Sequence, residues 1–136
     1  MTLGYARVQL KIGYQGSQSG IEIPIELSLA TRSVRLLAKV DTGAAICIFQ
    51  RDYAEELGID VESGLYQKVG TQTGTFDTFG HTVNLSCLDW QFETMVYFAV
   101  LRDLTRNVVG RIGWLEHFRL GLIDYDSTLY LSHYDD

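Results

Sequence analysis

The stretch RLLAKVDTGAAICIF, residues 35–49, places one acidic side chain in the middle of a largely apolar run. Asp41 follows the segment 36–40 and is followed at once by Thr42 and Gly43. Burying a lone carboxylate is costly unless a partner or hydrogen bonds compensate for the lost hydration. The Asp41 carboxylate therefore requires either a partner or a chemical role.

An Asp-Thr-Gly tripeptide at the end of a strand makes chemical sense as a unit. The acid serves as general acid or base when its pKa is tuned, and the threonine hydroxyl locks the loop onto neighbouring backbone. The glycine permits an unusual turn and a close approach by another backbone. Average residue usage gives such a tripeptide, with Ser or Thr in the middle, by chance in roughly one chain in fifteen of this length. Taken alone, it also fits an Asx-type turn.

Alternation of apolar and polar residues extends over much of the chain. Segments 8–12 and 21–29 alternate strictly, which predicts two strands with one dry face each. Pro24 lacks an N–H for a ladder, so it is expected at a sheet edge or facing solvent. Further strands are predicted at residues 36–40, 46–49 and 90–100.

Two later segments read as hairpins. In LYQKVGTQTGTFDTFGHTVNLSC, residues 65–87, glycines and threonines cluster between alternating stretches, which predicts a long hairpin with its tip at residues 71–74. RLGLIDYDSTLYLSHY, residues 119–134, predicts two closing strands around an Asp-Tyr-Asp-Ser turn.

Two short helices complete the predicted elements. Asp52 with Glu55 three residues later is typical of a capping box, and Gly58 is placed to end this helix. A second helix is expected at residues 113–118. Short strands about every ten residues with two minor helices describe an all-β barrel or sandwich.

Composition bounds the function classes. The 136 residues make one domain, 1–136, which needs no disulfide or metal to fold. A net charge of −6 argues against a nucleic-acid partner. The two cysteines, Cys47 and Cys87, are expected to be reduced, buried thiols in a cytoplasmic protein. No segment has the pattern of a signal peptide or a membrane span.

Other reactive residues have plainer explanations. The histidines do not stand at metal-ligand spacing with one another or with the cysteines, so no metal or cofactor is predicted. Turn chemistry accounts for Asp124 and Asp126. Cys47 has no neighbouring histidine, and an apolar strand raises a thiol pKa, which argues against a nucleophile.

Three motifs in order resemble one known family. VDTGA (residues 40–44), the Gly- and Thr-rich hairpin, and NVVGR (residues 107–111) are similar to the retropepsin-like aspartic proteases, above all the small stand-alone bacterial members. The resemblance covers about residues 21–131. It implies a mainly β, closed retropepsin-like barrel with one or two short helices.

The resemblance also implies roles for particular residues. Asp41 would be the catalytic aspartate, with an active-site loop of Thr42, Gly43 and Ala44. The flap over the substrate would be Thr71, Gln72, Thr73 and Gly74, and the loop would be supported by Val108, Val109, Gly110 and Arg111.

The chain departs from the family pattern beside these motifs. Ala45 stands where retroviral enzymes carry an aspartate, which would leave Arg111 without its usual partner, and Ile112 replaces an Asp or Asn. These changes bear on contacts with the substrate backbone and on dimerisation, but they leave the acid itself in place.

One chain supplies one Asp-Thr-Gly, whereas the chemistry requires two carboxylates that share a proton. The sequence therefore predicts an aspartic endopeptidase that acts on a protein or peptide substrate as a homodimer, with one Asp41 from each copy. The alternative is a catalytically silent module of the same fold that binds peptides or assembles with a partner.

Overall fold

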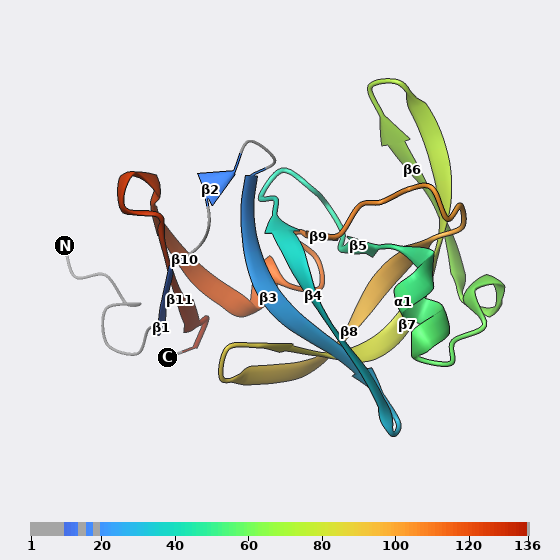
Figure 1. Cartoon of the computed structure of the whole chain (residues 1–136), viewed down its shortest axis with the longest axis horizontal. Helices are drawn as coiled ribbons and strands as arrows, with labels where there is room; N and C mark the ends of the chain where they lie inside the picture. Colours follow the sequence, from blue (N-terminus) through green and yellow to red (C-terminus); the bar gives the residue numbers. More distant parts are fainter. Residues whose placement is uncertain (1–9, 14–15, 18–19, 136) are drawn as a thin grey trace.

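The computed structural model describes residues 10–13, 16–17 and 20–135 (Figure 1). One α-helix, α1 (Arg51–Glu56), and three 3₁₀ turns (Val61–Ser63, Leu115–His117 and Asp124–Asp126) accompany the strands in this part of the chain. The strands are β1 (Leu10–Gly13), β2 (Gly16–Ser17), β3 (Gly20–Leu29), β4 (Arg32–Val40), β5 (Ile48–Phe49), β6 (Leu65–Thr71), β7 (Gly74–Cys87), β8 (Trp90–Ala99), β9 (Val108–Val109), β10 (Phe118–Ile123) and β11 (Thr128–His133).

Six strands close into a barrel. They run in the order β3-β4-β9-β5-β8-β7, and β7 pairs back onto β3 through Glu26–Ser28 and Asn84–Ser86. Closure leaves none of these six with a free edge over the paired residues. The predicted closed, mainly β barrel is confirmed.

The barrel core follows from the alternation in the sequence. Ile23, Ile25 and Leu27 of β3 are buried, whereas Pro24 between them is exposed to solvent as predicted. Each fully buried aliphatic side chain contributes about 1.5–3 kcal/mol to folding. The other strands supply the rest of the core, chiefly Leu36, Ala38, Phe49, Val83, Leu85, Val96, Phe98 and Val109.

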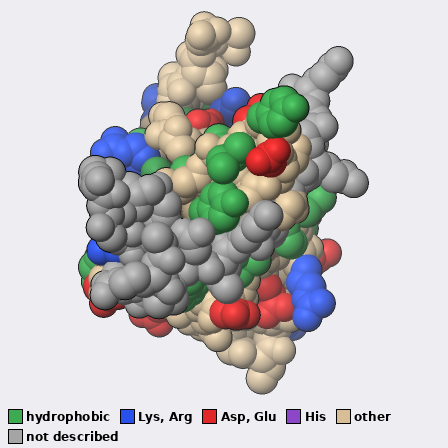
Figure 2. Space-filling model, turned by 90° about the vertical axis from the view of Figure 1, so that its left-hand side faces the viewer, with side chains coloured by type: hydrophobic (Ala, Val, Ile, Leu, Met, Phe, Trp, Pro, Cys, Tyr) green, Lys and Arg blue, Asp and Glu red, His purple; other side chains and the backbone are tan. Residues whose placement is uncertain are grey.

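A smaller sheet, ordered β1-β11-β10, lies beside the barrel at the left of Figure 1. The predicted closing strands and their turn are confirmed, with Ser127 in the left-handed region at φ 49°. Of the strand predicted at residues 8–12, the portion before Leu10 lies outside the described residues. Figure 2 views this end and shows hydrophobic side chains at the surface, and Tyr125 in the turn is 97% exposed.

Several predicted boundaries are wrong. Gln50, not Asp52, occupies the N-cap of α1, and no side chain caps that helix. The second predicted helix shrinks to the 3₁₀ turn Leu115–His117, and the strand predicted at 46–49 to β5. Gly58 does follow α1 with φ 78°, as predicted. None of the helices in the described part of the chain has the length and apolar character needed to cross a membrane.

Candidate active site

Asp41 lies directly after β4, in a turn fixed by backbone hydrogen bonds. The Asp41 N–H donates to the carbonyl of Val109 at 3.0 Å, and the Ala44 N–H donates to the carbonyl of Asp41 at 3.1 Å. The Gly43 N–H donates to Oδ1 of Asp41 at 3.0 Å. The half-buried carboxylate is therefore held in one orientation by its own turn.

Strand β9 is inserted between β4 and β5 and supports this turn from behind. It pairs in parallel with β4 and antiparallel with β5. Just beyond β9, the N–H groups of Arg111 and Ile112 donate to the carbonyls of Ala44 and Ala45, both at 2.9 Å. The loop backbone is thus fixed by a segment about 65 residues later in the chain.

Gly110 makes this close approach possible. A Cβ atom on it would stand 2.4 Å from the carbonyl oxygen of Ile46 and 2.7 Å from that of Ala44. Contacts that short with backbone atoms do not occur, so the position requires glycine.

Cys47 fills the space beneath the same loop. Its Sγ accepts from the Gly110 N–H at 3.4 Å and lies 3.6 Å from the Ile112 carbonyl, to which the thiol donates. Burial raises the pKa of Cys47 to about 11, more than the Gly110 bond lowers it. The thiol is therefore neutral near pH 7, and the predicted buried, reduced state is confirmed for both Cys47 and Cys87.

A cavity of about 430 Å³ opens between the Asp41 turn and the hairpin strand β6. Asp41 is the one carboxylate among the described residues that line it, and Lys68 and Arg106 are the cations. The other lining residues are Gly43, Ala44, Ala45, Ile46, Ile48, Gln67, Val69 and Gly70.

The hairpin of β6 and β7 has its tip at residues 71–74, as predicted. The Thr71 hydroxyl donates to the Gly74 carbonyl at 3.0 Å and accepts from the Thr73 N–H at 3.3 Å. The tip residues are exposed. Their hydrogen bonds in the described structure are made within the hairpin itself.

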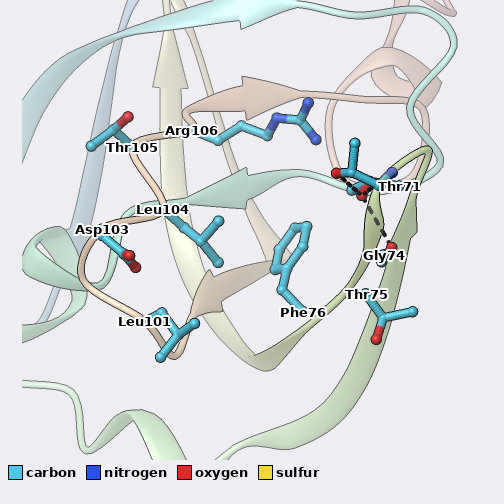
Figure 3. Close-up of a pocket in the computed structure, with 10 residues that line it drawn as sticks. Thr71, Gly74, Thr75, Phe76, Leu101, Asp103, Leu104, Thr105 and Arg106 are labelled. Carbon is cyan, nitrogen blue, oxygen red and sulfur yellow. Dashed lines mark hydrogen bonds between the residues drawn. The ribbon is translucent and has the colours of Figure 1, made fainter.

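A second cavity, of about 510 Å³, lies between this tip and the segment 101–106. Figure 3 shows Phe76, Leu101 and Leu104 extending toward its interior, and the Arg106 guanidinium directed toward Thr71. This cavity combines apolar side chains with one cation, Arg106, and one carboxylate, Asp103.

Comparison with known proteins identifies the architecture. No protein-family model and no curated protein sequence matches the chain. A retropepsin-like aspartic protease from Rickettsia conorii matches 90% of this chain and 98% of its own, with a TM-score of 0.68 and 23% identity. The protease of EIAV, complexed with the inhibitor HBY-793, matches 69% of this chain and 84% of its own, with a TM-score of 0.54 and 18% identity. The fold is retropepsin-like. At these identities the likeness establishes the fold.

In this retropepsin-like fold, the predicted site residues occupy three different environments. Asp41, Gly43 and Ala44 are among the residues that line the Asp41 cavity, whereas Thr42 is exposed and does not line it. Tip residues Thr71, Thr73 and Gly74 line the second cavity instead, and Gln72 is exposed. Behind the loop, Val108, Val109 and Gly110 are buried.

Arg111 behaves differently from its neighbours. Its side chain is exposed and has no hydrogen bond or ion pair within the described part of the chain. Ala45 and Ile112, the two departures from the family pattern, are exposed beside it, with Ile112 at 54%. The turn therefore presents the small, uncharged side chain of Ala45 at the position where retroviral enzymes carry an aspartate.

Sequence reasoning missed Arg106, Lys68 and Gln67, which line the Asp41 cavity. A signal for Arg106 was available, because it stands directly before the NVVGR motif that supports the loop. Lys68 and Gln67 carried no comparable signal, since only the folding of the hairpin over the loop brings them to the cavity.

Proposed function

We propose that this chain is an aspartic endopeptidase whose active site is built from the Asp41 carboxylates of two copies. The observation that carries the proposal is the Asp41 turn itself. A half-buried carboxylate is oriented by the Gly43 N–H, fixed from behind by β9, and open to a cavity beneath a projecting hairpin. The retropepsin-like fold supports the same activity.

The second carboxylate has to come from another copy. The chain contains a single Asp-Thr-Gly, and no other carboxylate among the described residues lines the Asp41 cavity. Thr42, Gly43 and Ala45 are exposed on the outer face of the turn, which leaves that face free to meet its symmetry mate. A two-fold axis beside the turn would bring the two acids together.

The reaction then follows from one shared proton. Two carboxylates a few ångströms apart cannot both ionise, so one is neutral while the other is charged. Water adds to the peptide carbonyl carbon and gives a proton to the charged carboxylate, while the neutral one protonates the carbonyl oxygen. The diol collapses as the C–N bond breaks: one of its hydroxyls gives its proton to the ionised carboxylate, and the neutral carboxyl gives a proton to the leaving nitrogen.

The hairpin suggests how a peptide would be held. Strand β6 is the last strand of the large sheet in the described structure, and its outer edge is exposed. An extended peptide that enters the cavity can add to this edge as a further strand. The proposed substrate is therefore a protein or peptide segment in extended conformation.

Asp41→Asn tests the assignment. It keeps the shape of the side chain and removes its titration, so peptide-cleavage rates should fall at least about a thousandfold with the melting temperature little changed. Asp89→Asn, in the exposed turn between β7 and β8, is the matched control and should keep full activity. Substantial cleavage by Asp41→Asn would remove the catalytic role. A wild-type protein that binds peptides without ever cleaving them would favour the silent binding module.

A further inference from the structure

Arg106 stands where the cavities around the Asp41 turn converge. It lines the Asp41 cavity, the cavity at the hairpin tip, and a third of about 230 Å³ beside Lys39 and Asn107. Figure 3 shows its side chain running along the edge of the second cavity, with the guanidinium on the side of Thr71. Arg106 therefore lies between the Asp41 turn and the hairpin tip, on the path that joins the two cavities.

The Arg106 guanidinium has no anionic partner within the described residues. The acids that share its cavities are Asp41, Asp103 and Glu22, and none of them pairs with it within 4 Å. Glu22 instead stands directly opposite Lys39 in the β3–β4 ladder. The five donors of Arg106 are thus available to a ligand.

Arg102, four residues earlier in the same segment, is the opposite case. Its guanidinium donates to Asp52 at 2.9 Å and to Glu55 at 2.6 Å, which ties the segment to helix α1. One arginine of the segment is therefore used to anchor it, whereas the other is presented to the cavities.

The charge of this region contrasts with that of the whole chain. Seventeen acidic residues outnumber eleven basic ones in the whole chain. In the Asp41 cavity the balance is reversed, because two cations, Lys68 and Arg106, line it together with a single carboxylate, Asp41. Asp77 lies opposite Lys68 in the hairpin ladder and accepts a hydrogen bond from Tyr66, so it offsets part of the Lys68 charge. Arg106 has no such counterpart.

Building on the proposed endopeptidase function, we infer that Arg106 is a specificity-determining residue that selects peptides with an acidic side chain close to the scissile bond. A guanidinium binds a carboxylate through paired, charge-assisted hydrogen bonds, and it gives a neutral amide no equivalent gain. The apolar floor of Phe76, Leu101 and Leu104 fits an apolar residue beside that acid. A peptide's free C-terminal carboxylate offers the same chemistry, but an endopeptidase substrate continues past the site, which favours the side chain.

The test measures binding, so that it does not depend on turnover. A single Glu is moved through an otherwise neutral, amidated octapeptide, and a matched series carries Gln. Affinities for the Asp41→Asn protein are measured by fluorescence anisotropy near pH 6, where a Glu side chain is ionised. At one position Glu should bind about fivefold to tenfold more tightly than Gln.

Two variants of the Asp41→Asn protein test whether Arg106 causes the preference for Glu over Gln. Arg106→Gln should abolish it, and Arg106→Glu should replace it with a preference for Lys at that position. Arg35→Gln makes the same change in net charge at an exposed cation that pairs with Glu26 and lines none of the three cavities around Arg106, so it should leave the preference intact. The preference should also fade below about pH 4, as the peptide Glu is protonated.

The inference is overturned if Glu is favoured at no position, if no peptide binds, or if the preference survives Arg106→Gln. It is also overturned if only a peptide with a free C-terminal carboxylate gains affinity. Cleavage of the neutral Gln series by the wild-type protein reports separately on the proposed function. Glu-selective binding without any cleavage would remove the endopeptidase proposal while leaving the selectivity of Arg106 in place.

Discussion

The Asp41 turn, residues 41–46, and the hairpin tip, residues 71–74, both contain threonine and glycine, yet they are held in opposite ways. The turn is tied by backbone hydrogen bonds to residues 109–112, far away in the sequence. The tip is tied to itself through Thr71, and Figure 1 shows the hairpin projecting from the barrel.

This difference separates two requirements of the proposed chemistry. A carboxylate that shares a proton with a second one has to stay in a fixed orientation, and non-local backbone hydrogen bonds supply that. A cover over a peptide has to open, and a tip bonded only within its own hairpin moves without breaking bonds to the barrel. Three predictions test the contrast.

The largest effect is expected from alanine at two glycines, one packed behind the Asp41 turn and one on the hairpin next to its tip. Gly110→Ala drives a Cβ into the carbonyls of Ile46 and Ala44, so the free energy of unfolding should fall by about 3 kcal/mol. Gly70→Ala, on β6, meets nothing within 4 Å and should change it by less than about 0.5 kcal/mol. Urea denaturation of both variants is the measurement. Equal losses would mean that the turn is no more tightly packed than the hairpin.

A smaller effect is expected from the thiol beneath the turn. Burial raises the pKa of Cys47 to about 11 from an unfolded value of 9.0. Its contribution is fully present below pH 9, and it is lost as the pH rises toward 11 because the unfolded thiol then ionises more readily than the folded one. By pH 11 the loss in the free energy of unfolding amounts to about 2 kcal/mol.

Cys47→Ala isolates that contribution. The wild-type protein should lose more stability between pH 8 and pH 11 than the variant does. Burial also raises the pKa of Cys87 to about 11, and this thiol contributes the same loss of stability in both proteins. Urea denaturation at both pH values gives the four free energies. If both proteins lost the same free energy of unfolding between pH 8 and pH 11, the group responsible would lie away from the turn.

The smallest effect is expected at the tip. Thr71→Val removes the hydroxyl that binds Gly74 and Thr73, and because the site is exposed, overall stability should change by less than about 0.5 kcal/mol. Amide exchange of Thr73 should quicken about threefold. Thr82→Val, at an exposed position of β7 outside the tip, is the control and should leave that exchange unchanged. A large loss of global stability in Thr71→Val would contradict the independence of the tip.

Local sequence patterns predicted the elements whose structure depends on neighbouring residues in the chain. Strict alternation located β3 to within one residue, and the Gly- and Thr-rich segment located the hairpin tip. The order of three motifs led to the retropepsin-like fold because each motif is a short, contiguous stretch.

The wrong or missing predictions concern residues whose position or partners depend on residues far away in the sequence. Gln50 became the N-cap of α1 because its amide pairs with that of Asn107, and its N–H donates to Asn107 Oδ1 at 3.0 Å. Glu55, expected in a capping box, binds Arg102 and Arg51 instead. The two-residue strand β9 carries no period at all, and Arg106 reaches the cavities only through the path of its segment.

The shared active site is tested most directly by dilution. Each half-site supplies one Asp41, so activity belongs to the dimer, and below the dissociation constant the dimer concentration scales with the square of the total protein. Peptide-cleavage activity and sedimentation are measured over the same dilution series. We expect specific activity to fall in proportion to dilution and to follow the dimer fraction throughout. A monomeric species with undiminished specific activity would contradict the account.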